Sequence, residues 1–163
     1  MLKKFAMIIG MFMLYIGVSQ NLPFLSVKRL REMPSLDRMT MIVARSDGAQ
    51  ISFEVSLART LKEQERGLMF VRSMPEMEGM AFLYSPPKNA SFWMKNTYIP
   101  LDILFISPGG KIQSIKKNAK PGDLTPIQSQ GVVEAVVELN AGIVDKYGIK
   151  EGDRVGVAPK KGQ

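Results

Sequence analysis

Residues 92–106 constrain the fold of this chain more than any other stretch. They contain the only tryptophan, Trp93, and they pass from an aromatic pair through polar residues to an almost unbroken apolar run. That run, residues 101–106, is short, rich in Ile, Leu and Phe, and bounded by Pro100 on one side and by Pro108 and two glycines on the other. Such a run predicts a strand that is buried on both faces of a sheet.

Asp102 is the single interruption of this run. A carboxylate at the mouth of a buried strand costs free energy unless hydrogen-bond or ionic partners surround it. Lys95, Asn96 and Thr97 precede the strand and could supply such partners. We therefore expect a polar cluster held against the core at the start of this strand.

The remaining sequence predicts short strands with brief helices. Residues 50–57 alternate strictly between polar and apolar side chains, which is typical of a strand with one wet and one dry face. Thr60 and Glu63 form a capping box for a helix over residues 61–66, which Gly67 can close in the left-handed conformation. Further strands are expected at residues 40–44, 80–84, 90–94, 111–115 and 132–139, a helical turn after Gly142 and a last strand ending near residue 157.

This order of elements shows no alternation of strands and helices of the kind that builds a parallel sheet. The predicted fold class is therefore mainly β or α+β: a compact antiparallel barrel-like or sandwich domain with two short helices. Residues 39–158 are expected to form this single domain, preceded by a basic linker at residues 20–38 and followed by a basic C-terminal tail at residues 159–163.

Residues 1–19 are expected to be a signal peptide or an N-terminal membrane anchor. Two lysines precede residues 5–18, which are almost entirely apolar but shorter than the roughly 20 residues of a comfortable membrane span. Cleavage after the small residues 17–19 and retention as a membrane attachment through residues 5–18 both remain open. Either way we expect export, to the periplasm or to the outer face of the cytoplasmic membrane.

Composition excludes several classes of chemistry. The chain has no cysteine and no histidine, which rules out disulfides, thiol catalysis, ordinary zinc sites and a histidine general base. No cofactor is expected. The net charge is +7, but the basic segment containing Lys116, Lys117 and Lys120 lacks interleaved aromatic residues, so we expect no nucleic-acid partner.

Five blocks of sequence, in order, resemble domain-of-unknown-function family 192, whose members are small and often exported. The resemblance covers approximately residues 41–157 and implies a compact β-rich domain without implying an established activity. Ala81 and Tyr84 depart from the larger aliphatic and aromatic residues expected there. The blocks are residues 65–69 with Arg72, Gly79 and Met80 with Phe82, residues 92–106, residues 137–142, and Ile149 with Gly152, Asp153 and Val155.

The polar segment before the buried strand is the first candidate site, and two interpretations of it stay open. In the first, Trp93 stacks on a ligand such as a sugar or peptide in a shallow pocket, while arginine and amide groups fix the polar atoms of the ligand. In the second, Asp102 accepts hydrogen bonds from Thr97 or Asn96 and pairs with an arginine, which fastens an irregular crossing to the sheet. The predicted ligand-binding residues are Arg66, Arg72, Trp93, Lys95, Asn96, Thr97 and Asp102.

Carboxylates offer a catalytic alternative. Glu134 and Glu138 are four apart on a predicted strand, about 13 Å along it, which is too far for a close pair. Asp102 with Glu138 is the only combination that could hydrolyse a glycan in the cell envelope by acid/base chemistry. The other interpretation is structural. In it, these three carboxylates and Asp153 are separate charges, each balanced by Lys or Arg.

Methionine offers a third possibility. Thioethers bind Cu(I), and the candidate ligands are Met69, Met74, Met77, Met80 and Met94, of which Met74, Met77 and Met80 are evenly spaced. Methionine is also common filler in irregular cores, and the chain has 12 of them. The sequence thus favours a non-catalytic envelope module that binds a small molecule, a glycan or a protein partner around Trp93, with a carboxylate hydrolase and copper binding as alternatives.

Overall fold

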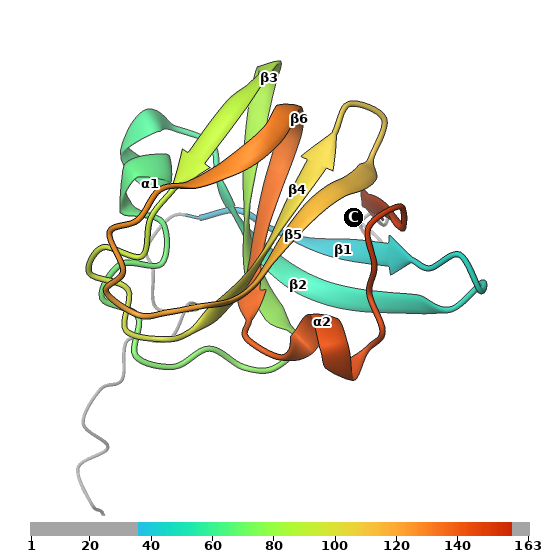
Figure 1. Cartoon of the computed structure of the whole chain (residues 1–163), viewed down its shortest axis with the longest axis horizontal. Helices are drawn as coiled ribbons and strands as arrows, with labels where there is room; N and C mark the ends of the chain where they lie inside the picture. The colour runs from blue at the N-terminus through green and yellow to red at the C-terminus, as the bar shows by residue number, and fades with distance from the viewer. Residues whose placement is uncertain (1–35, 158–163) are drawn as a thin grey trace, which may run out of the picture.

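The computed structural model describes residues 36–157, in which strands predominate. The strands are β1 (Arg38–Ala44), β2 (Gln50–Ala58), β3 (Glu78–Phe92), β4 (Leu101–Ser107), β5 (Lys111–Ala119), β6 (Ile127–Asn140) and β7 (Arg154–Val157), and the helices are α1 (Leu61–Arg66) and α2 (Ile143–Lys146). The strands close into a ring in the order β1-β2-β3-β6-β4-β5-β7 (Figure 1). The predicted barrel-like, strand-rich fold class with two short helices is confirmed.

One pair in this ring is parallel. β2 and β3 run in the same direction, from the pair Glu54 and Glu78 to the pair Ala58 and Phe82. Parallel neighbours need a crossover connection, and α1 with the irregular residues 67–77 supplies it. This crossover was not predicted, because a six-residue helix followed by an irregular segment does not show the periodicity of a strand–helix–strand unit.

β3 is longer than predicted. The two strands expected at residues 80–84 and 90–94 form one strand that continues through Ser85, Pro86 and Pro87. Its pairing with β6 shifts register between Leu83 and Lys88, so the prolines occupy a bulge. Proline has no N–H to donate and is tolerated at such a position, which is why these residues do not end the strand as predicted.

The core consists of two clusters separated by the sheet. Residues of β4 alternate between them: Ile103 and Phe105 join the first cluster, and Leu104 and Ile106 join the second. β4 is therefore buried on both faces, as its sequence predicts. Because successive side chains of a strand point to opposite faces, each residue of β4 and β6 belongs to one side of the sheet.

Of the two caps predicted for α1, the structure confirms the one at the start of the helix. Thr60 and Glu63 form both hydrogen bonds of the capping box at the start of α1. Gly67 ends the helix with φ 47° and ψ −135°, so the predicted left-handed conformation is wrong. A Cβ on Gly67 would lie 3.3 Å from the ring of Phe82, so a residue without a side chain suits this close approach.

The boundaries of the domain differ slightly from those predicted. β1 begins at Arg38, and Leu36 packs against the first core cluster, so the predicted linker overlaps the domain at its end. The predictions for residues 1–19 and 159–163 lie outside the described residues. No helix within residues 36–157 is long and apolar enough to cross a membrane.

Candidate functional site

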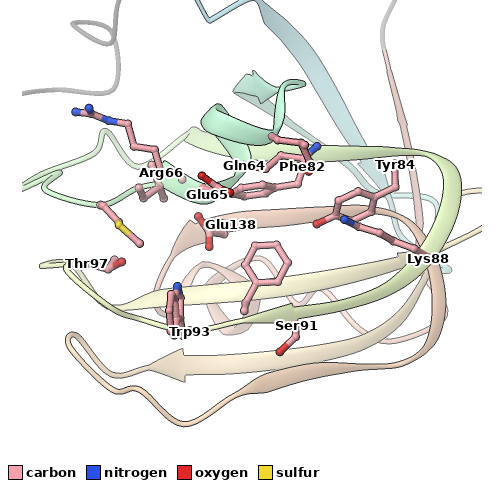
Figure 2. Close-up of a pocket in the computed structure, with 15 residues that line it drawn as sticks. Gln64, Glu65, Arg66, Phe82, Tyr84, Lys88, Ser91, Trp93, Thr97 and Glu138 are labelled. Atoms are coloured by element: carbon pink, nitrogen blue, oxygen red, sulfur yellow. The ribbon is translucent and has the colours of Figure 1, made fainter.

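A pocket of about 340 Å³ lies between α1, β3 and the segment that follows β3. Figure 2 shows its side chains converging from these elements, with Glu138 of β6 near the centre. The lining residues are Leu61, Gln64, Glu65, Arg66, Gly67, Leu68, Met69, Phe82, Tyr84, Lys88, Ser91, Phe92, Trp93, Thr97 and Glu138.

Glu138 is the most unusual group in this pocket. Its residue is only 5% exposed, and its carboxyl oxygen Oε2 has no hydrogen-bond partner among residues 36–157. Burial raises the pKa of Glu138 from 4.5 to about 8. Removal from water disfavours the charged form, so this carboxyl is largely protonated and neutral at pH 7.

Aromatic rings form much of the pocket wall. Phe82 and Phe92 meet edge to face with their ring centroids 4.9 Å apart. Tyr84 stands at the side nearest Lys88, whose Nζ lies 4.3 Å from the centroid of the tyrosine ring. Burial, and secondarily the charge of Glu138, raise the pKa of Tyr84 to about 12, so its hydroxyl stays protonated.

Trp93 forms the outer edge of the pocket. Half of its surface is exposed, and Nζ of Lys95 lies 4.9 Å from its ring centroid. The exposed indole therefore presents an apolar face to solvent beside the opening, as the stacking interpretation requires.

The predicted ligand-binding residues divide into separate groups. Arg66, Trp93 and Thr97 line the pocket with Glu138. Lys95 and Asn96 line a second, more open hollow that they share with Thr97. Arg72 and Asp102 line neither space, and the guanidinium of Arg72 lies 5.1 Å from the ring centroid of Tyr98.

Asp102 is buried, as predicted, but its partners differ from those predicted. Its residue is 1% exposed, and it accepts hydrogen bonds from the backbone N–H groups of Asn118 at 2.9 Å and Val144 at 3.0 Å. The hydroxyl of Thr97 donates instead to the carbonyl of Lys95. The expected bonds from Asn96 or Thr97 and the expected arginine pair are therefore wrong, and backbone amides of β5 and α2 satisfy this carboxylate instead.

Asp102 and Glu138 cannot act as an acid/base pair. Asp102 is opposite Leu139 in the register of β4 and β6, and Glu138 is opposite Ile103. Since Asp102 and Ile103 are successive residues, the two carboxyl groups lie on opposite faces of the sheet. The predicted catalytic pair is therefore wrong.

Comparisons with known proteins identify the domain. A family model, DUF192, described as an uncharacterized ACR, matches residues 42–157. The chain belongs to the DUF192 family. No curated protein matches this DUF192 chain.

Two solved structures resemble this DUF192 domain closely. A protein from Sinorhizobium meliloti, provisionally named a transcription regulator, is 37% identical with a TM-score of 0.74, over 76% of this chain and 95% of its own. A protein of unknown function from Novosphingobium aromaticivorans is 42% identical with a TM-score of 0.73, over 76% of this chain and 88% of its own. The family model agrees with the resemblance seen in the sequence.

Two other carboxylates of the DUF192 domain have backbone partners. Glu134 accepts a hydrogen bond from the N–H of Gly110 at 2.8 Å. Asp153 is buried and accepts from the N–H groups of Ser46 and Lys150, which ties the first hairpin to the last turn. These two groups fit the interpretation that the carboxylates are separate structural charges.

The evenly spaced methionines do not converge. Met74, Met80 and Met94 belong to the first core cluster, whereas Met77 packs against the second and Met69 lines the pocket. The copper-binding loop inferred from their spacing is therefore not formed. Within residues 36–157, no group of three or more acidic side chains is placed to hold a metal ion.

The sequence led to a pairing of Glu138 with Asp102 that the structure does not form, and it did not reveal most of the pocket wall. The available signal was its position in a strand that is otherwise apolar from Val136 to Leu139. That signal indicates burial, but it does not say which side of the sheet the carboxyl faces. The pocket wall includes residues of β3 on both sides of Pro86 and Pro87, where the sequence predicts that the strand ends: Phe82, Tyr84 and Lys88. No spacing in the sequence connects these residues with α1.

Proposed function

We propose that this DUF192 domain is a non-catalytic binding module that holds a small ligand in the pocket beside Trp93. One observation carries the proposal: the unpartnered Oε2 of Glu138 lies buried in a pocket of about 340 Å³. Buried polar atoms almost always have a partner, so an orphaned oxygen that lines a pocket indicates a group supplied from outside.

The composition of the pocket supports the same proposal. Small-molecule sites are mostly apolar clefts with a few polar groups that fix the orientation of the ligand. Here Phe82 and Phe92 supply apolar wall, Trp93 supplies a stacking face at the opening, and Glu138 supplies one deep polar group. A strongly perturbed carboxyl in a cleft is a recognised mark of a functional site.

The cellular setting is part of the proposal. A lysine pair followed by an apolar segment at residues 5–18 favours export, to the periplasm or to the outer face of the cytoplasmic membrane. The ligand would then be a component of the cell envelope or a solute that reaches it.

A ligand screen tests the proposal. We expect compounds that enter the pocket to change the fluorescence of Trp93, the only tryptophan, and to raise the Tm of the full chain. Binding should weaken in Glu138→Leu and Glu138→Gln and persist in Glu134→Gln, a matched change on the same strand. If no compound raises Tm, or if every hit binds the Glu138 variants as well as the wild type, the pocket is not a ligand site.

A further inference from the structure

We propose that the ligand of this pocket carries a primary ammonium group, which docks on the carboxyl of Glu138. This inference rests on the proposed function and adds the chemical class of the ligand. Three features of the pocket lead to it: the missing donor, the place of the pocket's own cations, and the aromatic wall.

The first feature is a missing hydrogen-bond donor. Oε2 of Glu138 is fully enclosed and accepts no hydrogen bond from residues 36–157. Once it is ionised, this carboxyl only accepts, so it is best satisfied by a group that only donates, and an ammonium group offers three N–H donors and no acceptor. A charged donor on a carboxylate also gives a shorter and stronger hydrogen bond than a neutral one.

The second feature is that the two cationic side chains that line the pocket do not pair with Glu138. Lys88 lines the same pocket, but its ammonium group lies over the ring of Tyr84. Arg66 also lines it, and Figure 2 shows its guanidinium pointing away from Glu138. Neither side chain lies within ion-pair distance of Glu138 in the described structure, so the place of a cation next to this carboxyl is open to a ligand.

The third feature is the wall itself. Aromatic faces attract cations, and two rings that line this pocket already do so: Tyr84 with Lys88 at 4.3 Å and Trp93 with Lys95 at 4.9 Å. The edge-to-face pair of Phe82 and Phe92 offers apolar surface to the carbon stem of an amine. A hydrocarbon stem ending in an ammonium group matches this combination of rings and one deep carboxyl.

The charged and titratable groups around Glu138 set the pH dependence. From α1 the pocket receives Glu65 and Arg66, and from β3 it receives Tyr84 and Lys88. From β4 the residue opposite Glu138 is Ile103, which does not titrate. Glu65 and Arg66 are exposed at the rim, so the buried carboxyl of Glu138 is the acid that changes protonation when a cation enters.

The sign of the pH dependence identifies the ligand class. Free Glu138 holds its proton up to about pH 8, and an ammonium ligand requires the ionised form. Binding then releases a proton, so affinity for an amine rises with pH toward about 8. A ligand that only accepts from the protonated carboxyl shows the opposite trend, and a ligand indifferent to it shows none.

A matched pair of probes provides the test: 2-phenylethylamine and 2-phenylethanol, titrated calorimetrically into the full chain at pH 6, 7 and 8. These differ in the ammonium group and share the ring and stem. We expect the amine to bind about 10-fold more tightly at pH 7 than at pH 6, because one proton is released per amine bound. The alcohol should show no such rise. Glu138→Gln should lose both the preference for the amine and its pH dependence, and Glu134→Gln should keep both.

The outcomes separate this inference from the proposed function. If screening hits bind and depend on Glu138, but the amine is not preferred or its affinity does not rise with pH, the ammonium assignment is wrong and the pocket remains a ligand site. An amine that binds Glu138→Gln as tightly as the wild type also refutes the assignment. If neither probe nor any screened compound binds, both proposals fail.

Discussion

Replacing the carboxyl of Glu138 should stabilise the domain at neutral pH. In the folded protein its pKa is raised from 4.5 to about 8 by burial, so the folded state holds this proton more tightly than the unfolded chain does. The resulting stabilisation is fully present below pH 4.5 and is lost as the pH rises through about 8. Glu138→Gln removes the titration while keeping a neutral polar side chain of similar size.

The size of this effect on the free energy of unfolding follows from the difference between the folded and unfolded pKa of Glu138. Between pH 4.5 and pH 7 the unfolded chain loses the proton and the folded protein keeps it, which lowers the free energy of unfolding by about 3 kcal/mol. Above pH 8 the loss approaches about 5 kcal/mol, a large part of the total stability of an ordinary domain. We therefore expect Glu138→Gln to gain about 3 kcal/mol over the wild type at pH 7, relative to their difference at pH 4.5.

Urea denaturation of both proteins at pH 4.5, 5.5, 7 and 8.5, followed by circular dichroism, measures this double difference. Glu134→Gln is the control, since Glu134 lies on the same strand but accepts a hydrogen bond from the N–H of Gly110. Comparing each variant with the wild type at every pH cancels the other titrating groups. A difference between wild type and Glu138→Gln that stays constant from pH 4.5 to 8.5 would refute the claim that this carboxyl is buried without compensation.

Two further predictions concern groups that hold the fold. Asp102→Ala should lower the free energy of unfolding by about 3 kcal/mol, because it leaves the buried N–H of Val144 and the partly buried N–H of Asn118 without an acceptor; a drop in the urea midpoint with an unchanged m value measures it, and a loss below about 1 kcal/mol would contradict the assignment. Thr60→Ala should cost about 1 kcal/mol by removing the capping box of α1, and an unchanged Tm in thermal unfolding would show that the cap does not stabilise this helix.

Local chemistry made parts of this fold predictable. α1 occupies the residues predicted because its capping box lies within four residues of sequence. β2 and β4 appear where alternation and a continuous apolar run indicate them. The prediction failed at Pro86 and Pro87, because a bulge in the pairing of β3 with β6 accommodates them, and that bulge depends on a strand some 45 residues away.

The sequence predicts the surroundings of a site residue only where the residue type and its neighbours in the chain indicate burial. An acid inside the apolar run of β4 is expected to be buried and to have hydrogen-bond partners. Asp102 is buried and accepts hydrogen bonds from backbone amides. Its partners were out of reach because Val144 lies 42 residues further along the chain. The pocket is less predictable still, since it depends on which face of β6 carries Glu138, and a register change of one residue would reverse that face.

Asp102 and Glu138 are neighbours in the sheet but lie on opposite faces, and their surroundings differ. On the face of Asp102, the neighbouring strand β5 and the helix α2 each direct one backbone amide at the carboxylate. On the face of Glu138, α1 and the segment after β3 leave a pocket, and Oε2 receives no donor. A domain selected for stability alone would place an apolar residue at position 138, because the carboxyl lowers stability at neutral pH. Substitutions at the two positions should therefore change the free energy of unfolding in opposite directions, with a loss at Asp102 and a gain at Glu138, and the position whose substitution stabilises the fold is the one that we propose for binding.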